Sequence, residues 1–160
     1  MRRIAVVTAC GRGKKNYPTK AYKLYKSSRI KAVYNLKNNT DMYILSAKYG
    51  LIHADEVIEP YDEVMTEDKA IQLTPSVAEK LKGYDFVIFF KAGARKEYLN
   101  CIHQACKLAN VNLIAFGYGN MGDIRKLPDL ITIANTLPPE SIADKVNELC
   151  KNPIVIINKR

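Results

Sequence analysis

The fold is decided by Tyr84-Asp-Phe-Val-Ile-Phe-Phe90, an apolar run that directly follows Gly83. Its apolar side chains are consecutive rather than alternating with polar ones, so we expect a strand that is covered on both faces, as in a parallel sheet. Similar apolar runs occupy residues 3–8, 42–46 and 111–116. Segments with a helical pattern separate these four runs, and this alternation is typical of an α/β fold.

The segments between the strands predict helices at residues 20–36, 66–82 and 94–110. Pro75 is a candidate interruption of the second helix. The remaining predicted segments are an irregular acidic stretch at 51–67, short helices at 119–127 and 139–151, and weaker strands at 130–134 and 154–157. We therefore expect a single α/β domain over residues 1–160, Rossmann-like and three-layered, with a mostly parallel open sheet of about five strands and helices on both faces.

The composition indicates a globular protein rather than a membrane protein or a small disulfide-stapled one. Hydrophobic residues make up 48% of the chain and charged residues 26%, and no apolar run is long enough to span a bilayer. The run after Arg3 is too short for a signal peptide, so we expect a cytoplasmic protein. The chain has four cysteines: Cys10, Cys101, Cys106 and Cys150. They form no Cys-x-x-Cys pair and have no zinc-like spacing with His53 or His103. We predict neither a metal nor a cofactor.

Positive charge is concentrated in the first quarter of the chain. Residues 1–40 hold eleven Lys or Arg and no Asp or Glu, while the formal net charge of the whole chain is +9. Residues 55–68 carry the opposite excess, with seven acidic residues and no basic one. The basic segment is either a solvated helix face or a surface for an anionic partner, with nucleic acid or nucleotide phosphates as the best candidates. A third alternative is a homodimer in which the basic and acidic segments meet.

Polar or glycine-rich segments follow each of the four main strands. They are Cys10-Gly-Arg-Gly-Lys14, Ser46-Ala-Lys-Tyr-Gly50, Lys91-Ala-Gly-Ala-Arg95 and Gly117-Tyr-Gly-Asn-Met-Gly122. Ligands of open parallel sheets bind outside the carboxyl ends of the strands, so we expect these segments to converge on one site. Glycines there allow close backbone approach and can present N–H groups to an anion. Lys14, Gly117 and Gly119 are therefore candidate ligand-binding residues.

Cys10 and Ser46 are candidate nucleophiles. Cys10 lies at a strand end close to basic residues, which favours a reactive thiolate, and its alternative role is that of a small buried side chain. Ser46 and Lys48 are two residues apart and point the same way on an extended backbone. They are consistent with a catalytic Ser–Lys dyad or with a hydroxyl and an amine that hold a phosphate.

The turn Glu59-Pro-Tyr-Asp62 contributes two carboxylates and a phenol. Glu59 and Asp62 suit a general base or acceptors for ribose hydroxyls, or they form local hydrogen bonds in a turn that Pro60 favours. Tyr61 either stacks on a nucleobase or packs against the protein. The Gly-x-Gly-x-x-Gly pattern at 117–122 is by itself a weak sign of dinucleotide binding.

Several of these segments together resemble a known signature. Leu45-Ser-Ala-Lys-Tyr-Gly-Leu-Ile52 followed by Pro60-Tyr-Asp62 resembles the YaaA-like proteins and related small uncharacterised α/β proteins. Their first-strand Cys-x-x-x-Lys and Ala-x-x-Leu-Tyr helix correspond here to Cys10…Lys14 and Ala21-Tyr-Lys-Leu-Tyr25. The resemblance implies DNA binding and a part in the peroxide stress response. A similar domain is also found with archaeal relatives of the tRNA-guanine transglycosylases.

Two functional hypotheses follow. The first is a nucleotide- or nucleic-acid-binding domain that acts on a nucleobase or an N-glycosidic bond. Its catalytic candidates are Glu59, Asp62, Ser46 and Cys10, and its ligand-binding candidates are Lys14, Lys48, Tyr61, Gly117 and Gly119. The second is a non-enzymatic DNA-binding or stress-response protein. The sequence leaves open whether the chain is an enzyme.

Overall fold

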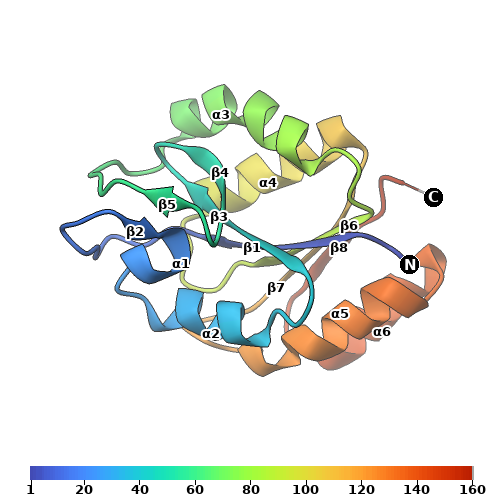
Figure 1. The fold of residues 1–160 in the computed structure, drawn as a ribbon. Coiled ribbons are helices and arrows are strands. Elements are labelled where there is room, and N and C mark those ends of the chain that lie inside the picture. The colour runs from blue at the N-terminus through green and yellow to red at the C-terminus, as the bar shows by residue number, and fades with distance from the viewer. Residues whose placement is uncertain (160) are drawn as a thin grey trace.

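The computed structural model describes residues 1–159 and contains an open six-stranded sheet (Figure 1). The strands are β1 (Ile4–Ala9), β3 (Asp41–Ser46), β4 (Gly50–His53), β6 (Phe86–Phe90), β7 (Asn112–Phe116) and β8 (Ile154–Ile156). Their order across the sheet is β4-β3-β1-β6-β7-β8. The four central strands are parallel, whereas β4 and β8 pair antiparallel at the edges. The predicted α/β class and mostly parallel sheet are confirmed, and the sheet has six strands rather than about five.

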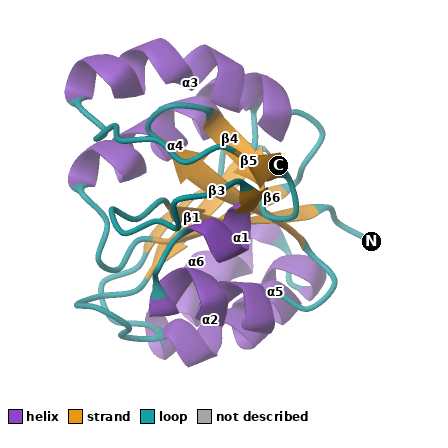
Figure 2. Ribbon diagram, turned by 60° about the vertical axis from the view of Figure 1, so that its left-hand side comes forward, coloured by secondary structure: helices purple, strands orange, loops and turns teal. Residues whose placement is uncertain are grey.

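Helices cover both faces of the sheet (Figures 1 and 2). One face carries α3 (Glu67–Leu81) and α4 (Lys96–Ala109). The other face carries α1 (Ala21–Leu24), α2 (Ser28–Leu36), the 3-10 helix η1 (Ile124–Lys126), α5 (Leu127–Thr136) and α6 (Pro139–Leu149). A short antiparallel pair, β2 (Thr19–Lys20) and β5 (Val57–Ile58), lies outside the main sheet.

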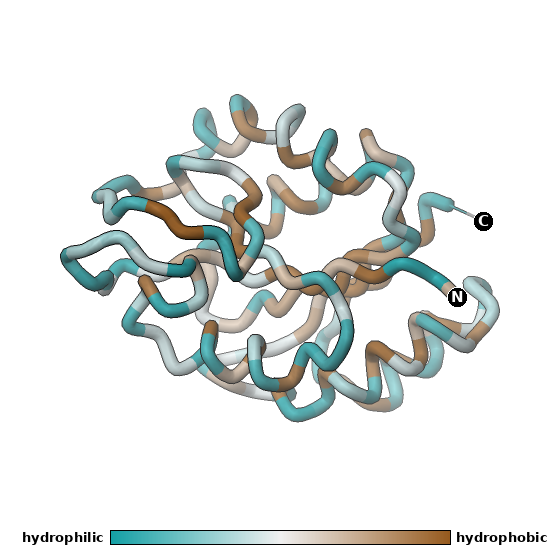
Figure 3. Tube along the Cα trace, in the orientation of Figure 1, coloured by the Kyte–Doolittle hydropathy of each residue, from teal (hydrophilic) through white to brown (hydrophobic). Residues whose placement is uncertain are grey.

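Strand β6 serves two hydrophobic clusters, because successive side chains of a strand point to opposite faces. Phe86, Ile88 and Phe90 belong to the cluster that contains α2 and α5, while Val87 and Phe89 belong to the cluster of α3 and α4. All five side chains are buried. Figure 3 shows hydrophobic residues along the strands and at intervals along the helices. The expectation of a strand covered on both faces is confirmed.

The prediction of one helix at residues 20–36 is wrong, because the chain breaks between α1 and α2. Ser27 begins α2 with an extended backbone, and its hydroxyl accepts a hydrogen bond from the N–H of Ile30 at 3.3 Å. Tyr25 lies in the break and is fully buried. The break therefore turns an aromatic side chain into the interior and starts a second helix at a serine cap.

Two further segments differ from the prediction. Residues 51–67 were expected to be irregular, but most of β4 and the whole of β5 lie there. Residues 130–134 form part of α5 instead of a strand. The buried residues of α5 include Leu127, Leu130, Ile131 and Ala134, which recur at helical spacing. This apolar face packs against the sheet and outweighs the strand preference of its isoleucines.

The other predicted elements agree with the structure, except for the helix expected at residues 119–127. Pro75 lies inside α3 without ending it. The helix expected at 94–110 is α4, that at 139–151 is α6, and the strand expected at 154–157 is β8. The helix expected at 119–127 is reduced to η1 and the first residue of α5. Within residues 1–159, no helix has both the length and the apolar character that crossing a membrane requires.

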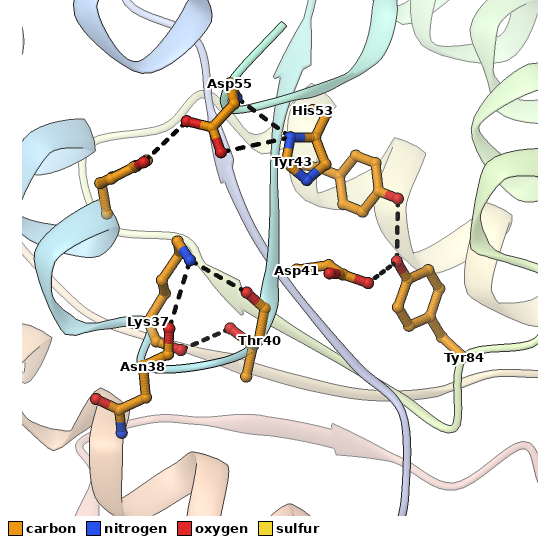
Figure 4. A network of polar contacts seen from close by, with 9 residues as sticks. Lys37, Asn38, Thr40, Asp41, Tyr43, His53, Asp55 and Tyr84 are labelled. Atoms are coloured by element: carbon orange, nitrogen blue, oxygen red, sulfur yellow. Dashed lines mark hydrogen bonds and ion pairs between the residues drawn. The ribbon is translucent and has the colours of Figure 1, made fainter.

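A polar network closes the edge of the sheet at which β3 begins (Figure 4). The Tyr84 hydroxyl donates to Oδ2 of Asp41 at 2.5 Å and lies 3.0 Å from the hydroxyl of Tyr43. Burial and the hydrogen bond to Asp41 raise the pKa of Tyr84, which keeps its proton for that bond. The nearby cavity of about 420 Å³ is lined partly by Arg2, whose guanidinium donates to the carbonyl oxygens of Ala134 and Leu137. These groups mostly satisfy one another, as expected for a structural edge.

Candidate functional site

A cleft lies outside the carboxyl ends of β1 and β6. From β1 the chain continues to β3, the neighbour of β1 on one side, whereas β6 is its neighbour on the other side. The strand order therefore reverses at this point of the sheet. The cleft has a volume of about 390 Å³. Its lining residues are Cys10, Gly11, Arg12, Lys14, Arg29, Asp62, Glu63, Val64, Gly93, Ala94, Arg95 and Tyr98. Of the four strand-end segments expected to converge, those that follow β1 and β6 line this cleft, whereas those that follow β3 and β7 do not.

Cys10 is half-buried in this cleft beside a tyrosine from α4. Its Sγ lies 3.1 Å from the hydroxyl oxygen of Tyr98. Burial is the main cause that raises the pKa of Tyr98, so its hydroxyl remains protonated and can donate to sulfur. The thiol is therefore exposed to the cleft on one side and hydrogen-bonded on the other.

Arg29 extends from the first turn of α2 to the back of the cleft. Its guanidinium donates to the carbonyl oxygens of Ala92 at 3.1 Å, Ala9 at 3.0 Å and Cys10 at 3.4 Å. Burial lowers the pKa of Arg29, although an arginine remains charged at neutral pH. No ion pair among residues 1–159 involves it. The cleft therefore holds a partly desolvated cation that has no carboxylate partner in the described part of the chain.

A cluster of hydroxyl groups lies beside the cleft. The Ser46 hydroxyl donates to Tyr61 at 2.8 Å, and the Tyr61 hydroxyl lies 2.5 Å from that of Tyr25. Ser46 also accepts hydrogen bonds from the backbone N–H groups of Lys48 and Tyr49, each at 3.1 Å. Its hydroxyl is thus fully engaged and buried, which suits a residue that positions Tyr61 better than one that attacks a substrate.

Lys14 connects the hydroxyl cluster with the cleft. Its ammonium nitrogen lies 4.5 Å from the centre of the Tyr61 ring and 5.7 Å from that of Tyr25. Burial raises the pKa of both phenols, so they stay neutral beside the cation. Because the ring faces of tyrosines attract cations, these contacts hold Lys14 at the cleft wall. Tyr61 supports the lysine in this way, while its ring forms a T-shaped contact with the ring of Tyr49.

The two carboxylates that line the cleft differ in their partners. Glu63 forms an ion pair with Lys69 of α3. Asp62 is exposed, and no ion pair among residues 1–159 involves it. Glu59 is exposed and lies outside the cleft lining, although its backbone carbonyl accepts a hydrogen bond from Tyr49 at 3.4 Å. Asp62 is therefore the carboxylate best placed to receive a hydrogen bond from a ligand.

A second cavity of about 320 Å³ adjoins the cleft between the ends of β6 and β7. Gly117 and Gly119 of the glycine-rich loop line this cavity rather than the cleft. Gly117 has a φ of +102°, and a Cβ there would lie 2.5 Å from a ring carbon of Phe90. Close packing therefore requires this glycine. Gly119 has a φ of +58°, with no atom within 4 Å of where a Cβ would lie, so its backbone faces open space.

Lys48 lies apart from these groups. Its side chain is exposed, and its ammonium nitrogen lies 5.3 Å from the ring centre of the neighbouring Tyr49. The structure thus brings Cys10, Lys14 and Asp62 together, with Ser46 and Tyr61 behind them. Glu59 and Lys48 line neither cavity, and Gly117 and Gly119 line the adjoining one.

The sequence interpretation missed Arg29, Tyr98 and Tyr25. Arg29 and Tyr98 belong to the first turns of helices on opposite faces of the sheet, so no strand-end motif includes them. The serine pair before Arg29 was the available signal, since a serine cap at residue 27 would have placed this side chain near a strand end. Tyr25 falls within the single helix predicted at residues 20–36, whereas the structure places it, buried, in the break between α1 and α2.

Comparison with known proteins gives a family but no activity. Neither a curated protein nor a solved structure matches the chain. The resemblance to YaaA-like proteins therefore stays a prediction. Residues 4–115 match a family of unknown function, DUF6884. This match runs from β1 through all but the last residue of β7 and includes every residue that lines the cleft. The chain belongs to the DUF6884 family.

Proposed function

We propose that this protein binds a nucleotide in the cleft at the ends of β1 and β6. The observation that carries the proposal is Arg29, a partly desolvated guanidinium that lines the cleft and forms no ion pair among residues 1–159. A buried charge is costly unless a partner of opposite charge compensates it. Backbone carbonyls supply part of that compensation, and a phosphate would supply the rest.

Three further basic side chains favour an anionic ligand. Arg12, Lys14 and Arg95 line the same cleft and come from the loops that follow β1 and β6. Of the two acidic residues in the lining, Glu63 is already paired with Lys69. The cleft therefore has an excess of positive charge, as a phosphate site requires.

The remaining polar groups fit the sugar of a nucleotide. Asp62 is a carboxylate at the cleft that forms no ion pair among residues 1–159, and it can accept hydrogen bonds from ribose hydroxyls. A carboxylate in this place would also stabilise the positive charge that develops on a sugar when its base departs. We extend the proposal to hydrolysis of the N-glycosidic bond, with Asp62 in that role and Cys10 as a contact of the sugar or base.

Titration calorimetry with the common nucleoside 5′-monophosphates tests the binding proposal. At least one should bind, its unphosphorylated nucleoside should bind at least about tenfold more weakly, and added salt should weaken the interaction. Arg29→Gln should lower the affinity by at least about tenfold. Arg125→Gln is the matched control, because Arg125 is exposed and lines neither cavity.

Arg29 also holds three carbonyl groups, so its variant could lose stability for reasons unrelated to a ligand. Lys14→Gln is the second test, since within residues 1–159 the Lys14 side chain makes a single hydrogen bond, to the carbonyl of Arg12. Equal affinity for nucleosides and their phosphates, or no loss of affinity in either variant, would contradict the proposal.

The proposed reaction is tested by chromatography, which detects the free base released from the nucleotide. Asp62→Asn should abolish this release while nucleotide binding persists.

A second candidate function is binding of single-stranded nucleic acid, favoured by a basic aromatic surface on α1 and α2. The rings of Tyr22 and Tyr34 stack with their centres 3.7 Å apart. Lys23 lies 5.6 Å from the Tyr22 ring centre, and Lys15 and Lys31 line the same shallow depression. Cations interleaved with aromatic rings are typical of surfaces that bind single strands.

The two candidate functions are separable by mutation. Lys23→Gln combined with Lys31→Gln should weaken oligonucleotide binding and reduce its salt dependence, because both side chains are exposed and basic. The same variant should bind a nucleoside monophosphate normally. Fluorescence anisotropy with a labelled single strand provides the measurement. Oligonucleotide binding that the double variant leaves unchanged would exclude this surface.

A further inference from the structure

We infer that the second cavity, between the ends of β6 and β7, holds a second phosphate of the ligand that occupies the cleft. This inference rests on the proposed nucleotide function and assigns a substrate class to it: nucleotides that carry two phosphates. The cavity and the cleft share residues 93–95 as a common wall. One ligand can therefore enter both spaces from the same side of the sheet.

The charges around the second cavity have one sign. Lys91, Arg95 and Lys96 line it, and no Asp or Glu does. Arg95 has a partner, because its Nε lies 3.5 Å from a carboxylate oxygen of Glu97. Neither Lys91 nor Lys96 takes part in an ion pair among residues 1–159. The cavity thus differs from the cleft, in which Asp62 and Glu63 face the basic residues.

Lys91 is held in place and still has free donors. Its backbone N–H donates to the carbonyl of Phe116 at 2.8 Å, and its ammonium group donates to the carbonyl of Gly117 at 2.8 Å. An ammonium group has three N–H donors, so this contact fixes the side chain and leaves two donors for a ligand. A fixed lysine loses less conformational freedom on binding than a free one does.

The backbone of the cavity is open to a bulky anion. Gly93 and Gly119 both have positive φ values, +70° and +58°, and neither places a side chain over the cavity wall. The space above Gly119 contains no atom within 4 Å of a Cβ position. A phosphate can therefore approach the main chain closely, next to the two lysines.

The second cavity has basic side chains and no carboxylate in its lining, which fits a phosphate. The cleft also contains carboxylates that can accept hydrogen bonds from hydroxyl groups, which fits a phosphorylated sugar. Two nucleotide types carry the required second phosphate. In a nucleoside 5′-diphosphate the two phosphates are adjacent, and in a 3′,5′-bisphosphate they flank the sugar. In both nucleotide types the second phosphate presents the same anionic oxygens to Lys91 and Lys96. A comparison of the two ligands therefore identifies which type supplies it.

The test is titration calorimetry with the 5′-monophosphate, the 5′-diphosphate and the 3′,5′-bisphosphate of each common ribonucleoside. We expect one of the two-phosphate ligands to bind at least about tenfold tighter than the monophosphate of the same base. Lys96→Gln should remove most of that preference and leave monophosphate affinity unchanged. Lys96 is exposed, so this variant should fold normally, and Lys107→Gln at the other end of α4 is the matched control.

Two results would overturn the inference while leaving the cleft as a nucleotide site. One is equal affinity for ligands with one and two phosphates. The other is a preference that survives Lys91→Gln combined with Lys96→Gln. If none of the ligands binds, the proposed function fails together with this inference. A preference for the diphosphate or for the bisphosphate supports it and distinguishes adjacent from flanking phosphates.

Discussion

The Sγ of Cys10 lies 3.1 Å from the hydroxyl oxygen of Tyr98, so a thiol that follows β1 meets a phenol from α4. The other three cysteines are buried. Burial raises the pKa of Cys106 to about 12 and that of Cys150 to about 11, and it also raises the pKa of Cys101. These three thiols therefore remain protonated and shielded at neutral pH.

We predict that iodoacetamide at neutral pH alkylates Cys10 first, because only this thiol is open to the cleft. Peptide mass spectrometry over a time course measures the order of labelling. Cys10→Ser should leave the folded protein almost unlabelled, and a bound nucleotide should slow the reaction at Cys10. Equally fast labelling of Cys150 would contradict the prediction.

The hydrogen bond from Ser46 to Tyr61 should contribute to stability, since Ser46 is fully buried. We expect Ser46→Ala and Tyr61→Phe each to lower the free energy of unfolding by about 1–3 kcal/mol. Because the two hydroxyls share one bond, the double variant should lose less than the sum of the two, with a coupling free energy of about 1 kcal/mol. Urea unfolding of all four proteins gives the cycle. Additive losses would mean that the contact contributes nothing of its own.

Stability should fall in alkaline solution. Burial raises the pKa of Tyr25, Tyr61 and Tyr98 above the ordinary value of 10.0. Above that value the unfolded chain releases phenol protons that the folded chain retains, so the unfolded state binds fewer protons and the free energy of unfolding decreases as pH rises. Below it, these groups should make stability independent of pH.

Urea unfolding at several pH values, together with tyrosinate absorbance, checks this dependence. The buried phenols should ionise only as the protein unfolds. Tyr25→Phe should make the alkaline decrease shallower, whereas Tyr17→Phe should not, because Tyr17 is 51% exposed. Ionisation of all tyrosines before unfolding would show that burial does not hold these protons.

The two glycines of the loop after β7 should respond differently to alanine. Gly117→Ala would place a Cβ 2.5 Å from the Phe90 ring at a φ of +102°, so we expect a loss of more than about 2 kcal/mol from overlap and backbone strain. Gly119→Ala meets open space at a φ of +58° and should cost only about 1 kcal/mol. Thermal unfolding of the two variants measures the difference. Similar losses would contradict the packing role of Gly117.

The sequence was sufficient to predict the four central strands of the sheet, but not its edge strand β4 or every helix around it. The apolar runs of β1, β6 and β7 have a single interpretation, since they are short, continuous and followed by polar or glycine residues. Residues 130–134 were ambiguous because Leu-Ile-Thr-Ile-Ala is rich in β-branched residues. The deciding signal lay just outside that window, where Leu127 extends the apolar pattern to helical spacing.

The site was predictable where it lies at strand ends and unpredictable where helices supply it. Cys10 and Lys14 belong to the segment that follows β1, and Asp62 belongs to the turn at residues 59–62; the structure places all three at the cleft. Arg29 and Tyr98 reach the cleft because α2 and α4 dock on opposite faces of the sheet. Docking of that kind depends on packing across the whole core, which local sequence patterns do not record.

That docking gives the cleft a property of its own. Tyr98 belongs to the helical layer on one face of the sheet, and Arg29 belongs to the layer on the other face. Both side chains contact Cys10, which follows the end of β1. A folding intermediate in which only one helical layer is packed on the sheet would lack either Tyr98 or Arg29 in the cleft. Ligand affinity would then serve as a measure of maturation, because only a chain with both layers assembled could be captured on an immobilised nucleotide.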